Sequence, residues 1–272
     1  MIKSTRYRQF LTDRRRIVVK IGTRVLVQKN GRPDVRRMAA IARDVAALRR
    51  SGHEVVLVSS GAIGAGTEAL GMDQRPTSVP DLQMCAAVGQ SRLMSRYDAI
   101  FSRLGIRVGQ ILLTHDDFHH KIRYTNAGRT IENLLRHAVL PIINENDVVA
   151  DEEIKADLSL GDNDLLAALV ARMIRAEVMV LLTTVDGLRS NFGTGRSKRV
   201  HYLESVTRRE LALAIGVKSS LSKGGMDSKL RAAKTAAGAG CMTVIACGRH
   251  AGILTRVMGG DDVGTLILAE GL

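Results

Sequence analysis

Seven runs of apolar residues recur along the chain, and within each run the apolar positions follow one another instead of alternating with polar ones. Continuous runs of this length are typical of parallel strands covered on both faces, because every side chain along such a strand is buried. The runs cover residues 16–22, 54–60, 109–114, 139–144, 178–184, 242–247 and 265–269. Most of them are separated by stretches long enough for a helix. The pattern therefore predicts a central parallel sheet with helices packed on it.

The stretch between the first two runs, residues 34–52, carries the clearest helical pattern. Its apolar residues form one stripe at helical spacing, Asp34 suits an N-cap and Gly52 suits the helix end. Helices are also expected over residues 82–104, 123–137, 163–176 and 227–239. This alternation predicts an α/β fold, namely a three-layer α/β/α sandwich with a central, mainly parallel sheet. Because no low-complexity linker divides the chain, we expect one domain with two lobes.

Acidic and amide side chains gather where predicted strands end and helices begin. The residues concerned are Asn144, Glu145, Asn146 and Asp147 at the end of one strand, and Asp162, Asn163 and Asp164 at the start of the next helix. In open α/β sheets, ligands bind beyond the carboxyl ends of the strands. We therefore expect these side chains to line a ligand site.

Three glycine-containing segments are candidate anion sites. Lys20 ends the first strand beside Gly22, where a lysine and backbone amides can bind a phosphate, although a lysine on the surface fits equally well. Residues 59–66, SSGAIGAG, offer amides at a helix N-terminus to a carboxylate or phosphate. The basic loop 222–229, SKGGMDSK, combines two lysines with a Gly-Gly pair, which favours a mobile phosphate clamp over a plain surface loop.

Several other kinds of site are disfavoured. Gly64, Gly66 and Ala69 imitate a dinucleotide fingerprint, but they come too late after their strand and no acid ends the next one. A GxxxxGK[ST] phosphate-binding motif is absent. The three cysteines are scattered in apolar segments, which favours buried reduced thiols of a cytosolic protein over a metal site. No apolar run reaches the roughly 18 residues that span a bilayer.

The chain is strongly basic, since 40 Lys and Arg against 27 Asp and Glu give a formal net charge of +13. Residues 1–16 and 196–235 hold much of this excess. A solvated basic surface would explain it, and so would attraction of nucleotides or nucleic acid. Aromatic residues, which nucleic-acid-binding modules use to stack bases, make up only 3% of the chain. Residues 1–16 run straight into the first strand, which argues against a targeting peptide.

These motifs together resemble the glutamate 5-kinases of the amino acid kinase family. The segments that carry the likeness are KIGTRVL (20–26), VSSGAIGAG (58–66), AAVGQSRLM (86–94), QILLT (110–114), PIINENDVV (141–149), GDNDLLAALVA (161–171), LLTTVDGL (181–188) and GGMDSKLRAA (224–233). The likeness covers nearly the whole chain from about residue 14. Its most specific part is NEND followed by GDND, which distinguishes this group from the uridylate, carbamate, aspartate and acetylglutamate kinases.

The resemblance implies an enzyme that phosphorylates the γ-carboxylate of L-glutamate with Mg-ATP, giving glutamyl 5-phosphate in the first step of proline biosynthesis. It implies that Lys20 and Lys229 are catalytic and hold the transferring phosphoryl group, and that Asp164 orients both lysines. The glutamate site would comprise Ser60, Gly61, Ala62, Asn144, Asp147, Asp162 and Asn163. The ATP site would comprise Lys20, Gly22, Thr23, Thr183, Thr184, Lys223, Gly224, Gly225, Met226, Asp227, Ser228 and Lys229. No residue is expected to bind metal directly, because ATP carries the Mg²⁺.

The same resemblance implies an organisation and a set of partners. Residues 1–272 would form a single amino acid kinase domain, with a glutamate-binding lobe over about 14–176, an ATP-binding lobe over about 177–272 and a basic extension over 1–13. We expect a cytoplasmic homo-oligomer, a dimer or a tetramer, whose product goes to a glutamyl phosphate reductase. Neither a membrane nor nucleic acid is an expected partner. The alternatives are another activity of the family, on acetylglutamate, aspartate, carbamate or UMP, and a nucleic-acid-binding module.

The chain departs from the usual pattern of these kinases at several positions. Thr184 stands where an aspartate is common, Lys223 adds a cation to the glycine loop, and Gly128 replaces an arginine. Residues 156–160 are an insertion beside the expected glutamate site, where proline inhibits many members. The C-terminal PUA domain of many bacterial members is also not expected here.

Overall fold

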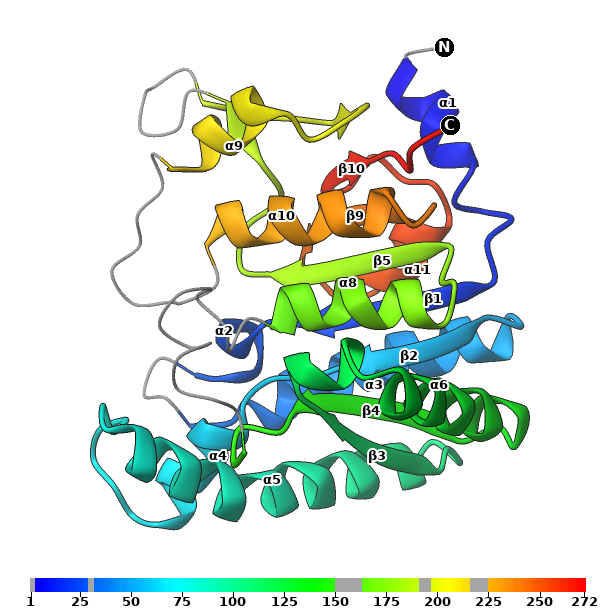
Figure 1. The fold of residues 1–272 in the computed structure, drawn as a ribbon. Helices are drawn as coiled ribbons and strands as arrows, with labels where there is room; N and C mark the ends of the chain where they lie inside the picture. Colours follow the sequence, from blue (N-terminus) through cyan, green and yellow to red (C-terminus); the bar gives the residue numbers. More distant parts are fainter. Residues whose placement is uncertain (1–2, 29–31, 150–162, 191–196, 216–224) are drawn as a thin grey trace.

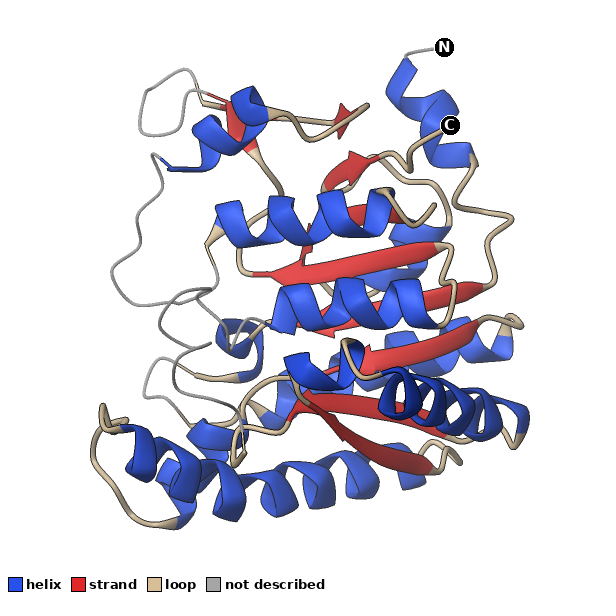
Figure 2. Ribbon diagram, viewed as in Figure 1, coloured by secondary structure: helices blue, strands red, loops and turns tan. Residues whose placement is uncertain are grey.

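The computed structural model describes residues 3–28, 32–149, 163–190, 197–215 and 225–272. Its centre is an eight-stranded sheet in the order β3-β4-β2-β1-β5-β9-β10-β8, with helices on both faces (Figure 1 and Figure 2). The strands are β1 (Arg16–Ile21), β2 (Glu54–Val58), β3 (Val108–Leu113), β4 (Leu140–Glu145), β5 (Val178–Thr183), β8 (Tyr202–Leu203), β9 (Met242–Cys247) and β10 (Thr265–Ile267). The predicted three-layer α/β/α sandwich is therefore confirmed.

The sheet is mainly parallel, as the continuous apolar runs predicted. The strands from β3 to β9 in the sheet order pair in parallel, β10 runs antiparallel to β9, and β8 pairs in parallel with β10. All seven predicted runs form strands of this sheet. The carboxyl ends of the parallel strands lie on one side of the molecule, at the left of Figure 1, next to α2 (Thr23–Leu26) and the start of α4 (Ala62–Ala69).

Two hydrophobic cores separate the sheet from its two helix layers. On one face lie α3 (Val35–Arg50), α5 (Val79–Ser102) and α11 (Ile253–Met258), and on the other lie α6 (Lys121–Arg136), α8 (Asn163–Met173) and α10 (Met226–Ala237). Successive side chains of a strand point to opposite faces. In β1, Ile17, Val19 and Ile21 accordingly enter the α3 side, and Val18 enters the α8 side. Lys20 has the same parity as Val18.

The predicted end signals of α3 are confirmed. The Asp34 carboxylate accepts a hydrogen bond from the Arg37 backbone N–H at 2.9 Å, which satisfies one of the free donors in the first turn. Gly52 follows the helix with φ = +87°, a left-handed conformation that glycine adopts without a steric penalty. The remaining described elements are α1 (Lys3–Gln9), the 3₁₀ helix η1 (His115–Phe118), α9 (Arg208–Ile215) and the hairpin of β6 (Arg189–Ser190) with β7 (Lys198–Arg199).

Helices α4 and α5 cross with their backbones in contact. A Cβ atom on Gly66 would lie 1.8 Å from the Cys85 carbonyl oxygen, and one on Gly89 would lie 1.8 Å from the Ala62 carbonyl oxygen. Only glycine fits at either position. Gly66, which belongs to the SSGAIGAG segment, is thus used in helix packing.

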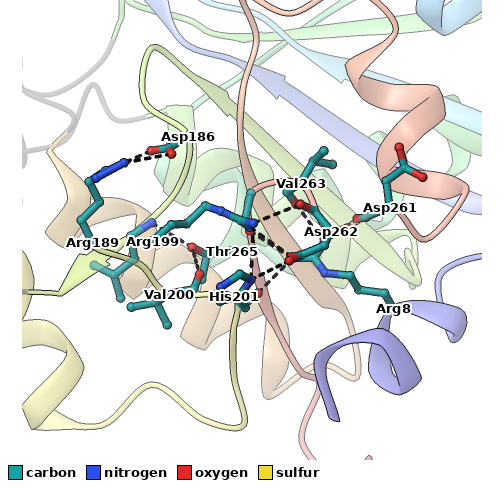
Figure 3. A network of polar contacts seen from close by, with 12 residues as sticks. Arg8, Asp186, Arg189, Arg199, Val200, His201, Asp261, Asp262, Val263 and Thr265 are labelled. Carbon is teal, nitrogen blue, oxygen red and sulfur yellow. Dashed lines mark hydrogen bonds and ion pairs between the residues drawn. The ribbon is translucent and has the colours of Figure 1, made fainter. Parts of the chain in front are cut away.

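Helix α1 joins the N-terminal segment to the C-terminal half of the chain through one buried arginine (Figure 3). The Arg8 side chain is fully buried and forms an ion pair with Asp262 at 3.2 Å. Its guanidinium also donates to four backbone carbonyls, those of His201, Asp261, Val263 and Gly264, at 2.8–3.0 Å. Among the described residues, no helix is long and apolar enough to cross a membrane.

Candidate active site

Lys20 lies at the carboxyl end of β1 and points to the α8 side of the sheet. Its side chain is almost fully buried, and its Nζ lies 2.6 Å from Oδ1 of Asp164. Gly22, two residues after this lysine, lets the backbone pass close to β5, since a Cβ there would lie 3.1 Å from the Leu182 carbonyl oxygen. The Gly22 backbone N–H donates to that same oxygen at 3.0 Å, which ties this segment to β5.

Asp164 connects the two lysines that the sequence nominated. It is the second residue of α8 and is fully buried. Its Oδ1 pairs with Lys20, and its Oδ2 pairs with Nζ of Lys229 from the first turn of α10 at 2.8 Å. The structure therefore brings together three residues from β1, α8 and α10, neighbouring elements in Figure 1.

The charges of this cluster determine its protonation. Burial alone would raise the pKa of Asp164, but the positive charges of Lys20 and Lys229 and their hydrogen bonds outweigh burial and hold the pKa well below its usual value. Asp164 is thus a carboxylate at neutral pH. Two lysines against one aspartate leave one positive charge in excess in a nearly dry environment. Such a cluster attracts an anion.

The start of α10 adds a hydroxyl to the cluster. Ser228 Oγ donates to Oδ2 of Asp164 at 3.3 Å and lies 3.0 Å from the Gly225 carbonyl oxygen. Gly225 is the N-cap of α10 and offers no side chain to the free N–H groups of the first turn. The positive end of a twelve-residue helix therefore faces the site beside Lys229.

A second group of polar side chains lies next to Asp164 and is held by one amide. Asn163 Nδ2 donates to the Ser59 carbonyl at 2.9 Å, to Ser60 Oγ at 2.9 Å and to Asn144 Oδ1 at 3.1 Å. These bonds fix the orientation of the Asn163 side chain. Its Oδ1 is buried and has no hydrogen-bond partner among the described residues. Within the described part of the chain, this acceptor is thus left for a further donor.

Two residues of α5 complete this group although the site predictions did not include them. Gln90 Oε1 accepts a hydrogen bond from Asn144 Nδ2 at 2.8 Å, and the Tyr97 hydroxyl lies 2.7 Å from Ser59 Oγ. Both lie at helical spacing with the buried residues Ala86 and Leu93. Polar side chains within an apolar helix stripe indicate buried hydrogen bonds, so the sequence pattern could have identified these two residues.

The other predicted site residues are distributed around this centre. Gly61 follows Ser60 with φ = +109° and caps α4, which Ala62 begins. Thr183 ends β5, Thr23 begins α2, and the Asp227 carboxylate pairs with Arg231 at 2.8 Å instead of joining the lysines. Of the remaining candidates, Thr184 lies just after β5, Asp147 is half-buried and Met226 begins α10. Asp162, Lys223 and Gly224 lie outside the described residues, as does the insertion 156–160.

Solved structures with the same architecture share this fold. The chain superimposes on carbamate kinase from Giardia lamblia bound to AMP-PNP with a TM-score of 0.66 and 18% identity, covering 95% of this chain and 100% of that one. It superimposes on UMP kinase from Bacillus anthracis with a TM-score of 0.62 and 14% identity, covering 95% and 97% of the two chains.

Residues 15–247 match the model of the amino acid kinase family, so the chain belongs to that family. Several similar relatives carry the same name. The chain is 44% identical over 260 residues to glutamate 5-kinase from Geobacter sulfurreducens, covering 95% of this chain and 69% of that one. It is 43% identical over 273 residues to glutamate 5-kinase from Thioalkalivibrio sulfidiphilus, covering 98% and 70%. Within the family, the chain groups with the glutamate 5-kinases.

Proposed function

We propose that Lys20, Asp164 and Lys229 form the catalytic centre of a glutamate 5-kinase, which transfers the γ-phosphoryl group of ATP to the γ-carboxylate of L-glutamate. The reaction follows from membership of the glutamate 5-kinases. The assignment of these residues is supported by one observation. A single buried aspartate holds two lysines from distant parts of the sequence with one oxygen each.

The main barrier that such a site must lower is electrostatic. Both reactants are anions, and two unit charges about 4 Å apart repel by roughly 4 kcal/mol at an effective dielectric constant near 20. Phosphoryl transfer needs little covalent help from the protein, and depends on in-line alignment and on neutralised charge. Lys20 and Lys229 supply the positive charge. Asp164 keeps both ammonium groups aimed at one point.

No general base is needed for this reaction. The γ-carboxylate of glutamate has an ordinary pKa of about 4.3 and is already ionised at neutral pH. The lowered pKa of Asp164 fits the same scheme, because a carboxylate that stays ionised between two lysines positions them and does not take a proton. We therefore assign Asp164 an orienting role.

The amide group around Asn163 supports a glutamate site beside the lysines. Oδ1 of Asn163, which no described residue contacts by a hydrogen bond, is an acceptor suited to the α-ammonium group of an amino acid. Ser60 and Asn144, which hold the Asn163 amide, would complete the wall of this site with Gly61 and Ala62. We propose that Asp147 and Asp162 add negative charge for the ammonium group.

ATP would lie on the other side of the lysines, over the ends of β1 and β5 and the start of α10. The candidate contacts are Gly22, Thr23, Thr183, Thr184, Lys223, Gly224, Gly225, Met226, Asp227 and Ser228. Both oxygens of Asp164 are engaged by lysines, so this carboxylate does not suit a metal ion. We expect the phosphates of ATP to hold the Mg²⁺ and bring it into the site.

The reaction can be tested with an acyl phosphate trap. Purified protein with Mg-ATP, L-glutamate and hydroxylamine should form glutamyl hydroxamate, since hydroxylamine attacks the acyl phosphate. No hydroxamate above the enzyme-free blank would contradict the function. Aspartate, acetylglutamate, carbamate and UMP in place of glutamate test the other activities of the family.

We further propose that the enzyme works in the cytoplasm as a dimer or tetramer and passes its acyl phosphate to a separate reductase. Cys85, Cys241 and Cys247 are buried and free, which suits a reducing compartment. The product is a reactive acyl phosphate that water destroys, so a reaction that consumes it promptly must follow. Light scattering on the purified protein tests the oligomeric state.

A further inference from the structure

A cavity of about 480 Å³ lies on the molecule outside the candidate active site. It opens between α2, the start of α3 and the turn that follows β9. Its walls include three arginines, Arg24, Arg37 and Arg249, together with Val25, Val27 and Asp34. The volume is within the range of small-molecule sites, roughly 300–1,000 Å³. We call this space the arginine cavity.

The arginine cavity and the lysine cluster lie on opposite sides of the sheet. Val25, which lines the cavity, packs in the core with the residues of α3 and α11. Lys229 and Asp164 begin the helices of the other layer. None of the residues proposed to bind glutamate or ATP lines the cavity. A ligand bound there would therefore use residues other than those proposed for either substrate.

The cavity holds more positive charge than the protein neutralises. The side chains of Arg24 and Arg249 are exposed and form no hydrogen bond or ion pair within the part of the chain that the structure describes. Arg37 donates from Nη1 to the Arg249 carbonyl, which ties two walls together and leaves its other N–H groups available. The carboxylate in the cavity, Asp34, is engaged as the N-cap of α3. Three guanidinium groups therefore face one carboxylate.

The arrangement is built from three separate segments. Arg24 comes from α2, Arg37 from the first turn of α3, and Arg249 from the turn after β9. That turn is anchored, since the Gly248 backbone N–H donates to the Thr183 carbonyl at 2.8 Å and a Cβ on Gly248 would lie 2.9 Å from Val25. Like charges brought together this way repel one another, and a bound anion would relieve that repulsion.

We propose that the arginine cavity is a binding site for a small multivalent anion bearing phosphate or carboxylate groups. The planar guanidinium group pairs with such oxygens through two parallel hydrogen bonds, and three of them suit an anion with two or more charges. Val25 and Val27 offer an apolar surface to the carbon part of the ligand.

Isothermal titration of the purified full chain with inorganic pyrophosphate, and separately with citrate, tests the site. Each titration is run without Mg²⁺, with and without a saturating non-hydrolysable ATP analogue that fills the catalytic site. At least one anion should bind the wild type with the analogue present. The double substitution Arg24→Gln/Arg249→Gln should weaken that binding at least tenfold. Arg36→Gln, at an exposed arginine of α3 that does not line the cavity, is the matched control and should bind like the wild type.

The outcomes separate the proposal from its rivals. Binding that the ATP analogue abolishes places the anion at the lysine cluster and overturns the proposal, as does equal affinity in the double variant and the wild type. Failure of both anions to bind also overturns it. The affinities of pyrophosphate and citrate for the wild type show whether the site prefers phosphate or carboxylate groups. If the double variant fails to fold by circular dichroism, each single substitution is tested in the same way.

Discussion

At the scale of single residues, the candidate active site depends on the balance between two lysine charges and one aspartate charge, and a substitution can change each charge separately. Lys229→Ala removes one of the two cations that we propose act on the transferring phosphoryl group. We expect kcat to fall by roughly two to three orders of magnitude, as for the loss of a group that stabilises charge in the transition state. Steady-state kinetics measure it. Lys234→Ala, at an exposed lysine of the same helix, is the control. A Lys229→Ala enzyme near the wild-type rate would remove this lysine from the mechanism.

Asp164→Asn tests the pairing itself through stability. Removing the charge leaves two buried lysines without their carboxylate, a loss of about 3–5 kcal/mol in the free energy of unfolding. Because the folded-state pKa of Asp164 is lowered, its contribution is present above the unfolded pKa of about 3.9 and is lost as the pH falls below it. The difference between wild type and variant should therefore narrow in acid. Urea unfolding from pH 7 to pH 3 measures it.

The outcome that contradicts this prediction is a constant difference between the two proteins across that range. Asp227→Asn is the matched control, since its carboxylate forms a pair with Arg231 on the helix surface. Surface pairs contribute about 0–1 kcal/mol, so this variant should stay near the wild type at every pH.

Gln90 tests the amide group beside the lysines. Gln90→Leu removes the oxygen that accepts a hydrogen bond from Asn144 Nδ2. The Oδ1 of the same Asn144 amide accepts a hydrogen bond from Asn163. An amide left without its partner costs about 1–3 kcal/mol. We expect KM for glutamate to rise roughly tenfold or more, with KM for ATP little changed. Gln83→Leu, elsewhere on α5, should leave both constants near those of the wild type. An equal rise in both KM values in Gln90→Leu would argue for a general disturbance of the fold.

The sequence carried much of this site but not its contacts. Resemblance nominated Lys20, Asp164 and Lys229, whereas the side of the sheet on which Lys20 lies came from the structure. That Asp164 uses one oxygen for each lysine depends on side-chain orientation, which no spacing rule supplies. Gln90 and Tyr97 contact their partners across the interface between α5 and the sheet, and such contacts have no counterpart in local sequence.

At the scale of elements, the crossing of α4 and α5 is the most restrictive contact. Gly89→Ala would place a methyl group 1.8 Å from the Ala62 carbonyl oxygen, so the helices must separate. Overpacking of this kind typically costs 1–3 kcal/mol, and we expect at least the upper value because backbone is what blocks the methyl group. Thermal and urea unfolding measure it.

Gly128 supplies the contrasting substitution. It lies inside α6 with its nearest neighbour, Met173 Cγ, 3.5 Å from an added Cβ. Gly128→Ala should be neutral or should stabilise the protein by about 0.5–1 kcal/mol, since alanine loses less conformational freedom in a helix. Equal destabilisation by both alanines would contradict the packing argument.

The long helices and strands could be predicted from the pattern of apolar and polar residues, whereas several short ones could not. All seven apolar runs and all five predicted helices are present in the structure. The two-residue strand β8 and helices α1 and α11 were missed. β8 exists because β10 supplies its hydrogen bonds, and a pattern of two residues carries no periodicity from which to predict it.

At the scale of the whole molecule, Arg8 joins the beginning of the chain to its end. Arg8→Ala would leave four backbone carbonyls and Asp262 without this partner, and we expect a loss of about 3–5 kcal/mol in the free energy of unfolding. Arg6→Ala, at an exposed position of the same helix, should be close to neutral. Urea unfolding compares the two. If they are equally stable, the buried guanidinium does not hold the termini together.

Residues 1–13 were predicted to form a basic extension, because the sequence shows their positive charge but does not show which residues contact Arg8. Those partners lie more than 190 positions away in the sequence. Only the folded chain brings them together.

The lysine cluster also has a consequence for the newly made protein. Lys20 leaves the ribosome early, whereas Lys229 emerges much later, after the whole of the parallel sheet up to β5. Until α10 docks, Asp164 lacks its ion pair with Lys229, and the proposed catalytic centre lacks its second cation. Under the proposed mechanism, a nascent chain therefore cannot complete its catalytic centre before α10 has docked.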